Sequence, residues 1–243
     1  MSDLCVNNNL WLSRLSAEDR AAITVHLWPR ILAHGEILFD QGDLLTTVYF
    51  VDEGIISSII PLNDGRGLEA FMVGNEGLTG IEASYVAARA INRLRVQAAG
   101  RARGIGVATF QQIVAARPGV RAALAKYEWG LRAELEQTGA CNAAHTAERR
   151  FAKWLLRCHD RTVGDVLHIT QEFLAQILGT QRSTINEAAQ SLQKAGAIRY
   201  MRGKITVRSR RALEAAACEC YSPLMATRDA PTGSLQGEQR QAG

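Results

Sequence analysis

The chain has 243 residues, of which 47% are hydrophobic and 21% are charged, and its formal net charge is +4. This length suits one or two domains with a sizeable core, and the lack of any run of about 18 apolar residues argues against a membrane-spanning helix. The opening stretch MSDLCVNNNLWLSRLS lacks the basic segment followed by an apolar segment that is typical of a secretory signal peptide. The five scattered cysteines favour reduced thiols in a cytoplasm over a disulfide framework.

Charge is unevenly distributed along the chain. Residues 1–145 carry 13 Lys and Arg against 15 Asp and Glu, whereas residues 146–220 carry 13 against 7. Residues 221–243 carry two of each sign. A polyanion such as nucleic acid would be attracted to the basic segment. A basic surface that only improves solubility is the alternative.

The N-terminal half alternates short apolar runs with glycines. Residues 36–39, 47–52, 55–60 and 67–73 have strand-type side chains, and turns are expected at the glycines between these runs. Further strands are expected at 93–98 and 102–108. Many short strands with Gly-rich turns predict an all-β barrel or sandwich.

A long helix is expected to begin at Pro118, since proline suits the first helical position. Its apolar residues recur at spacings of three or four, at Val120, Leu124, Tyr127, Leu131 and Leu135. This near-heptad spacing is typical of a coiled-coil contact between two copies. Packing of the helix on its own β-domain would use the same stripe, and spacing alone does not separate the two.

A further helix is predicted over residues 147–158. Its core stripe is formed by Phe151, Trp154, Leu155 and Cys158. The basic residues of this helix are expected to face away from that stripe, either toward DNA phosphates or simply toward solvent; they are Arg149, Arg150, Lys153 and Arg157.

Two short helices are predicted in the stretch ITQEFLAQILGTQRSTINEAAQSLQKAGAI, residues 169–198. Thr170 suits an N-cap and Gly179 suits the end of the first helix, because glycine tolerates a left-handed conformation. The second helix runs from about residue 181 to 195 and ends before Gly196. Its apolar positions share one side and are Ile185, Ala188, Ala189, Leu192 and Ala195.

The opposite side of the second helix is polar, with Arg182, Ser183, Asn186, Glu187 and Gln190. These side-chain types hydrogen-bond to base edges, whereas an ordinary solvated helical hairpin is usually rich in Lys and Glu. The pattern therefore favours a DNA-binding helix-turn-helix over that alternative.

A basic β-hairpin is predicted directly afterwards, in AIRYMRGKITVRS at residues 197–209. The Arg202-Gly203 pair supplies the turn. The basic residues of the hairpin are Arg199, Arg202, Lys204 and Arg208. We interpret it as a wing that contacts phosphates beside the groove, the alternative being an edge hairpin protected by its charge. Residues 222–243 lack periodicity and are expected to form a disordered tail.

The order of these elements resembles the Crp/Fnr family, the bacterial transcription regulators related to the cyclic-AMP receptor protein and FNR. ILFDQGD and VYFVDEGII look like the first strands of that family's β-roll, and residues 169–198 look like its DNA-binding motif. The resemblance implies an α+β protein with an N-terminal β-roll, a double-stranded β-helix or jelly roll of the cyclic-nucleotide-binding kind. The implied domains are a sensor at 1–117, a dimerisation helix at 118–145, a winged helix-turn-helix at 146–220 and a tail at 221–243.

The resemblance implies a homodimeric, sequence-specific transcription regulator that binds double-stranded DNA in the cytoplasm. Its β-roll would sense a small-molecule effector or another signal and thereby bias the two DNA-binding heads. An activator of this kind would also contact RNA polymerase. No membrane partner is expected.

Residue by residue, the resemblance places Arg182 at the start of the recognition helix, where its guanidinium can pair with guanine O6 and N7. Family members often have Glu at the next position, and the cyclic-AMP receptor branch often has Arg at a later one. Here these residues are Ser183 and Glu187, so the DNA sequence read is expected to differ from that branch's. The residues expected to contact DNA are Thr170, Gln171, Gln181, Arg182, Ser183, Thr184, Asn186, Glu187, Arg202 and Lys204.

The ligand motif departs from that of the family's cyclic-nucleotide binders, which have Gly-Glu followed by Arg-Ser or Arg-Thr. Here Ile81 follows Gly80, and the Arg-Ser position falls near Asn92-Arg93. Arg93 or Arg95 could hold an anion or could lie at a strand edge. Because Ile81 cannot replace the carboxylate that binds the ribose, cyclic AMP is not expected as the signal. The alternative that a different ligand binds in the same roll stays open.

The cysteines argue against two kinds of metal site. The FNR branch binds an iron–sulfur cluster through clustered N-terminal cysteines, and this chain has only Cys5 there. Cys218 and Cys220 form a C-x-C that could bind metal or respond to oxidation, and Cys141 and Cys158 could join only if the fold brings them near. Without a second ligand pair this is a weak metal signal. We therefore expect reduced, packed cysteines and no metal site.

Structural or surface roles are expected for the histidines at 26, 34, 145, 159 and 168. No paired catalytic carboxylates, nucleophile elbow or P-loop is found, so no catalytic residue is assigned and the chain is not expected to be an enzyme. Two alternatives to the sensing regulator stay open. One is a constitutive DNA-binding regulator with a vestigial sensor, and the other is a ligand-gated regulatory module that does not bind DNA.

Overall fold

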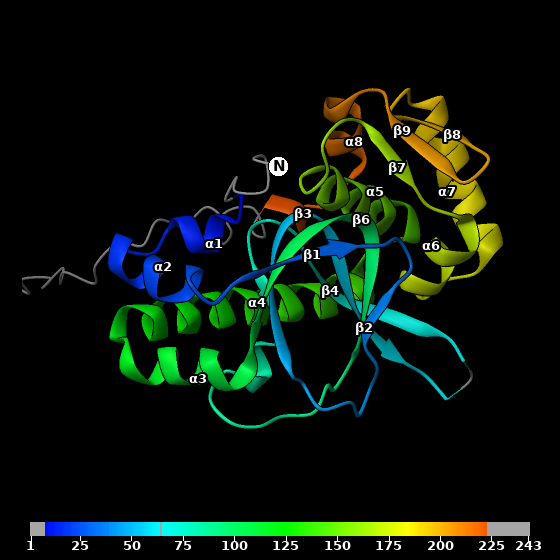
Figure 1. The fold of residues 1–243 in the computed structure, drawn as a ribbon. Helices are drawn as coiled ribbons and strands as arrows, with labels where there is room; N and C mark the ends of the chain where they lie inside the picture. The colour runs from blue at the N-terminus through cyan, green and yellow to red at the C-terminus, as the bar shows by residue number, and fades with distance from the viewer. Residues whose placement is uncertain (1–7, 64, 223–243) are drawn as a thin grey trace, which may run out of the picture.

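The computed structural model describes residues 8–63 and 65–222. The predictions for Cys5 and for the tail after Ser222 concern residues outside these ranges. A β-roll occupies one end of the molecule, a long helix runs beside it, and a smaller domain of helices and a short sheet lies at the other end (Figure 1). The predicted α+β architecture is confirmed.

The β-roll is an antiparallel sheet in which β1, β6, β3 and β4 are neighbours in that order. β2 also pairs with β6, and β5 also pairs with β3. The strands are β1 (Trp28–Leu32), β2 (Ile37–Phe39), β3 (Thr47–Pro61), β4 (Gly67–Val73), β5 (Leu78–Thr79) and β6 (Arg93–Gly106). One turn of 3₁₀ helix, η1 (Ile81–Ala83), follows β5. β1 was not predicted.

β3 and β6 are each one long strand where the sequence predicts two. Gly54, a predicted turn, has a φ of +95° and lies where the register between these strands shifts. A Cβ at Gly54 would lie 2.6 Å from the carbonyl oxygen of Ala98, and one at Gly100 would collide with that of Glu53. The glycines therefore form a bulge at which the strands bend and continue around the roll.

Four helices pack beside the roll, and of these only the last was predicted. They are α1 (Leu10–Ser13), α2 (Ala17–Thr24), α3 (Val107–Ala116) and α4 (Pro118–Ala144). Trp11, Phe50 and Phe110 share one core cluster with Val120 and Leu124 of α4. This cluster fastens the first half of α4 to its own β-roll.

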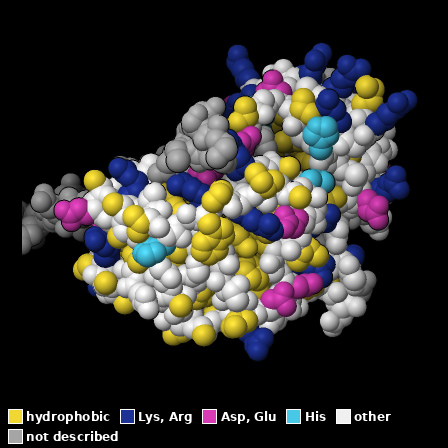
Figure 2. Space-filling view, in the orientation of Figure 1, with side chains coloured by type: hydrophobic (Ala, Val, Ile, Leu, Met, Phe, Trp, Pro, Cys, Tyr) yellow, Lys and Arg dark blue, Asp and Glu magenta, His cyan; other side chains and the backbone are white. Residues whose placement is uncertain are grey.

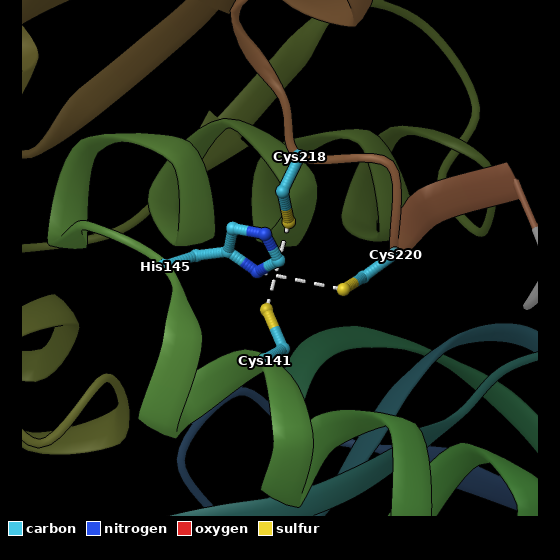
Figure 3. Close-up of side chains that lie close together, drawn as sticks. All are labelled: Cys141, His145, Cys218 and Cys220. Atoms are coloured by element: carbon cyan, nitrogen blue, oxygen red, sulfur yellow. Dashed lines mark hydrogen bonds between the residues drawn. The ribbon is translucent and has the colours of Figure 1, made fainter.

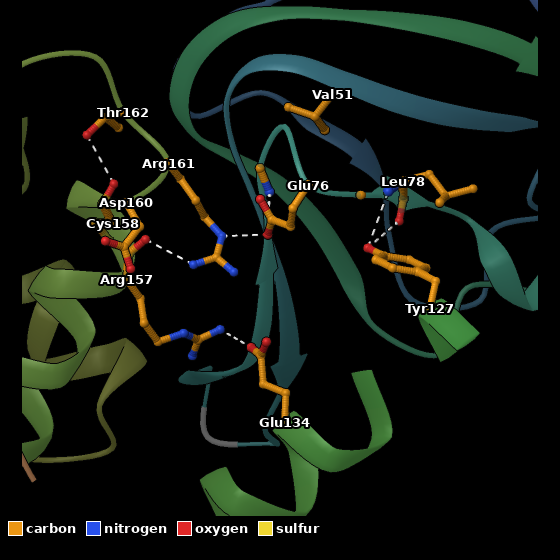
Figure 4. A network of polar contacts seen from close by, with 12 residues as sticks. Val51, Glu76, Leu78, Tyr127, Glu134, Arg157, Cys158, Asp160, Arg161 and Thr162 are labelled. Carbon is orange, nitrogen blue, oxygen red and sulfur yellow. Dashed lines mark hydrogen bonds and ion pairs between the residues drawn. The ribbon is translucent and has the colours of Figure 1, made fainter. Parts of the chain in front are cut away.

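Of the two alternatives for the apolar stripe of α4, packing on the chain's own β-domain holds for Val120, Leu124 and Tyr127. The Tyr127 hydroxyl donates to the carbonyl of Leu78 at 3.1 Å and accepts from its N–H at 3.2 Å (Figure 4). Burial raises the pKa of this hydroxyl. Leu131 is buried, whereas Leu135 is 41% exposed.

The C-terminal domain contains the two predicted short helices and the predicted hairpin. Its elements are α5 (Ala147–His159), β7 (Val166–His168), α6 (Gln171–Ile177), α7 (Arg182–Lys194), β8 (Ile198–Met201), β9 (Lys204–Val207) and α8 (Arg210–Ala216). β7, which was not predicted, pairs with β9 and makes the hairpin a three-stranded sheet.

The two domains share a core. The cluster that holds α5, α6 and α7 together also contains Ile55 of β3 and Met72 of β4. Around it, the Trp154 indole N–H donates to Glu69 Oε1 at 2.8 Å. Arg161 pairs with Glu76 at 2.7 Å, as Figure 4 shows. The C-terminal domain is thus docked on the face of its own β-roll.

This docking corrects the prediction for the basic residues of α5. Lys153 and Arg157 are each only 4% exposed, so they face neither phosphates nor solvent. Arg157 pairs with Glu134 of α4, and Arg150 donates to the carbonyl of Leu178 at 2.9 Å. Of the four basic residues, Arg149 is exposed as predicted.

Candidate DNA-binding surface

The first helix of the motif begins at a side-chain cap, and the second follows it after a glycine turn. The Thr170 hydroxyl accepts from the N–H of Phe173 at 3.2 Å and caps α6, as predicted. Gly179 has a φ of +59°, a conformation that glycine adopts without strain, and it lies against Leu68 of the β-roll. The chain then turns directly into α7, with Gln181 at its N-cap position.

α7 has one buried side and one exposed side. Ile185, Ala188, Ala189 and Leu192 are buried in the domain core. Arg182, Ser183, Asn186, Glu187 and Gln190 are exposed. The predicted division of the helix into an apolar and a polar face is confirmed except at Ala195, which follows the last residue of α7 and is exposed. The polar face is available to a partner.

The polar ends of the two helices meet. The Gln171 amide on α6 donates to Asn186 Oδ1 on α7 at 3.3 Å. Thr170 and Gln181 are exposed beside them, and Thr184 is partly buried. The structure thus brings the residues predicted on both helices into one continuous surface.

The hairpin lies beside this surface. Its turn has a φ of +51° at Arg202 and +74° at Gly203, the pattern of a tight two-residue hairpin. The Ile169 N–H donates to the carbonyl of Gly203 at 2.8 Å, and the Tyr200 hydroxyl donates to the carbonyl of Ile169 at 3.1 Å. These bonds fasten the hairpin to the residue just before the Thr170 cap.

The electrostatics of the surface are positive. Arg199, Arg202, Lys204 and Arg208 are all exposed on the hairpin. Figure 2 shows Lys and Arg side chains projecting around the end of the molecule that carries the C-terminal domain. A phosphate backbone is attracted by such a surface.

The residues considered for a ligand in the β-roll already have protein partners. Arg93 pairs with Asp40 through two contacts, of 3.0 and 2.8 Å, which raise the pKa of Arg93 and lower that of Asp40. The Arg95 guanidinium lies 5.1 Å from the ring centroid of Phe173 on α6. Ile81 packs at the edge of the cluster that holds α4. The Asp40 pair and the Phe173 contact could not be found from strand patterns, because both partners are distant in sequence.

The cysteines divide into two groups. Cys158 is buried in the shared core, where its sulfur accepts from Gln97 at 3.2 Å and burial raises its pKa. Cys141 instead lies beside Cys218, Cys220 and His145. The fold thus brings Cys141 to Cys218 and Cys220, which the sequence analysis had left conditional, but not Cys158. His145 was not predicted to join them, because it lies 75 residues from Cys220 in the chain.

The comparisons with known proteins agree with this geometry. A family model of the Crp-like helix-turn-helix domain matches residues 149–216. A solved structure of FixK2 from Bradyrhizobium japonicum is similar with a TM-score of 0.67 and 19% identity, over 79% of this chain and 98% of that one. A Crp/Fnr family regulator from Eubacterium rectale has the same TM-score and identity, over 86% and 98%. Residues 149–216 thus match a Crp-like helix-turn-helix domain, and the chain shares the fold of these Crp/Fnr-type structures.

The same architecture occurs in CLP of Xanthomonas campestris, described as a c-di-GMP-responsive global regulator. It is similar with a TM-score of 0.63 and 17% identity, over 80% of this chain and 100% of that one. No curated protein matches the chain. Among the helices that the structure describes, none is both long and apolar enough to cross a membrane.

Proposed function

We propose that this Crp/Fnr-type chain acts as a homodimer that reads a specific DNA sequence through α7 and is controlled by a signal at the β-roll. The observation that carries the proposal is the exposed polar face of α7 beside the basic hairpin. A helix-turn-helix dimer reads two half-sites about 34 Å apart, one turn of the duplex. Each chain would supply one α7 to the major groove.

Within this surface we assign base reading to the first turns of α7. The Arg182 guanidinium can pair with guanine O6 and N7, and the Asn186 amide can pair with adenine N6 and N7. Glu187 can accept from cytosine N4. The remaining contacts, mainly to phosphates, are assigned to Thr170, Gln171, Gln181, Ser183, Thr184, Arg202 and Lys204.

The proposed signal is not cyclic AMP. The residues present do not fit that ligand, because Ile81 follows Gly80 and packs at the edge of an apolar cluster, while Arg93 is already paired with Asp40. A buried phosphate needs a positioned cation, and releasing Arg93 would leave Asp40 without its partner. The proposed signal would pass from the roll to the DNA-binding domain through two direct contacts, that of Arg95 with Phe173 and that of Glu69 with Trp154.

The first test selects bound duplexes from a random pool with the purified chain. We expect enrichment of a two-fold symmetric site with half-sites one helical turn apart. Arg182→Ala should then weaken binding to the selected site by about 1–3 kcal/mol and relax the preference at one base pair in each half-site. Lys204→Ala should instead weaken binding to all sequences alike and reduce the slope of log affinity against log salt by about 1.

Arg89→Ala is the matched control, since Arg89 is exposed on the β-roll far along the chain from α7 and loses the same charge. Equal affinity of the Arg182→Ala and Arg89→Ala proteins for the selected site would refute the assignment of α7. Enrichment that needs no added metabolite would favour the constitutive regulator over the sensing one. A chain that enriches nothing even with cell metabolites would favour the module that does not bind DNA.

A further inference from the structure

A cluster of three cysteines and one histidine joins the end of α4 to the end of the DNA-binding domain. Cys141 lies in the last turn of α4 and His145 follows that helix directly, while Cys218 and Cys220 follow α8. One ligand atom from each residue lies within 4.8 Å of the other three, and the side chains point toward a common centre (Figure 3). The second ligand pair that the sequence argument lacked is therefore Cys141 and His145.

The separations match a four-coordinate metal. Two sulfurs at about 2.3 Å from a tetrahedral Zn²⁺ lie about 3.8 Å apart, and a sulfur and an imidazole nitrogen lie about 3.6 Å apart. Here Cys141 Sγ and Cys218 Sγ are 3.5 Å apart, and Cys220 Sγ and His145 Nδ1 are 3.6 Å apart. Small shifts would place all four ligand atoms at the corners of one tetrahedron around the ion.

The groups around the cluster are those that orient metal ligands. His145 directs Nδ1 at Cys220, and its Nε2 lies 3.0 Å from Glu219 Oε1. A carboxylate that accepts from the second ring nitrogen fixes the tautomer of a metal-bound histidine. The Gln137 amide also donates to Cys220 Sγ at 3.0 Å, as outer-shell donors do at thiolate ligands.

A buried positive charge complements the cluster. Lys153 is 4% exposed and lies beside Cys141. Three thiolates and one neutral imidazole around Zn²⁺ carry a net charge of −1. The Lys153 ammonium would neutralise it, which gives a reason for burying a lysine here.

We propose that Cys141, His145, Cys218 and Cys220 bind one Zn²⁺ ion and form a closed structural site. Three sulfur ligands and one nitrogen ligand in a tetrahedron are typical of structural zinc. On binding, each of the three thiols loses its proton to solvent and forms a zinc–sulfur bond, while the neutral imidazole donates a lone pair. No electron is transferred. The ion would tie the end of α4 to the segment after α8, and so would link the two segments that flank the DNA-binding domain.

The test begins with the full chain purified in a reductant that does not bind metals. We expect about one zinc ion per chain by elemental mass spectrometry. After removal of the zinc, titration with Co²⁺ should give the strong visible absorption of tetrahedral thiolate-bound cobalt. Cys220→Ser should change that spectrum, whereas Cys158→Ser, which alters a buried cysteine outside the cluster, should leave it unchanged.

Glu219→Ala should retain the spectrum but weaken zinc binding by about 10- to 100-fold, since only the support of His145 is removed. Reduced wild-type protein that contains no zinc and takes up no Co²⁺ overturns the proposal, whether or not any variant folds. An identical cobalt spectrum in Cys220→Ser also overturns it. A disulfide between Cys141 and Cys218 in the native protein overturns it in favour of a redox pair.

Discussion

Arg157 crosses from α5 to α4 and neutralises Glu134 where little water reaches either group. The side chains of Arg157 and Glu134 are only 5% and 12% exposed. Burial lowers the pKa of Arg157 to about 10, so the guanidinium stays charged at neutral pH. Removing one member of such a pair leaves a buried charge without a partner, which costs far more than the pair itself contributes.

Arg157→Met should therefore lower the free energy of unfolding by about 3–5 kcal/mol, because Glu134 keeps its charge and loses its partner. The double variant Arg157→Met/Glu134→Leu should recover most of that loss. Urea denaturation followed by circular dichroism measures both. If the double variant were as unstable as the sum of the two single variants, the pair would have no coupling and the explanation would be wrong.

At the scale of single residues, the sequence predicts the exposed face of α7 well and the basic residues of α5 poorly. Arg182 and Asn186 lie on a helix with only one apolar side, so helical spacing alone exposes them. Lys153 and Arg157 lie on a helix that is buried on further sides, by the β-roll and by α4. The residues that bury them are distant in sequence, and no local pattern identifies them.

At the scale of elements, α4 divides into two parts with different roles. Its first turns are buried against the β-roll through Val120 and Leu124. Farther along, Trp129 is 63% exposed and Leu135 is 41% exposed. A large aromatic residue that its own chain leaves mostly exposed fits the proposed contact with α4 of a second copy, because tryptophan is common at the centre of such interfaces.

Trp129→Glu should weaken the proposed dimer by about 2 kcal/mol or more, which is about 30-fold in the dissociation constant. The reason is that the anchor is lost and a charge is placed in the contact. Sedimentation equilibrium over a range of concentrations measures the change. Val25→Glu places the same charge at a residue that is 76% exposed near α2, and it should leave the dimer intact. Dimers of equal strength in both variants would rule out this face of α4.

The elements differ in how far the sequence predicts them. β4 and the hairpin strands are found at their predicted positions because alternating side chains and glycine turns bound them. The sequence analysis divided each of the long strands β3 and β6 at glycines, which form a bulge instead of a turn. Because glycine suits both a turn and a bulge, the sequence alone does not separate the two. α1 and α2 are too short to show a helical period, and α3 follows β6 without a break.

At the scale of the whole molecule, the two domains form one structure through their shared core. Ile55 and Met72 of the β-roll belong to the same cluster as the helices of the DNA-binding domain, and Arg95 reaches the ring of Phe173. We expect a change in the roll to reach α6 directly through these contacts. The sequence predicts the two domains and their order, but it contains no periodic signal for the face through which they dock.

Met72→Ala tests this coupling. Met72 is 1% exposed, and its truncation should cost about 2–5 kcal/mol through lost burial and the cavity left behind. Because Met72 belongs to the core cluster that contains residues of α5 and α6, we expect faster hydrogen exchange of the amides of those helices as well as of β4. Leu32→Ala makes a similar truncation of an equally buried residue in the separate core of the β-roll. It should speed exchange in β1 and β6 and leave α6 nearly unchanged. If Met72→Ala left the exchange of α6 at its wild-type rate, the shared core would not couple the domains, and a signal in the roll would have to reach α7 through α4 alone.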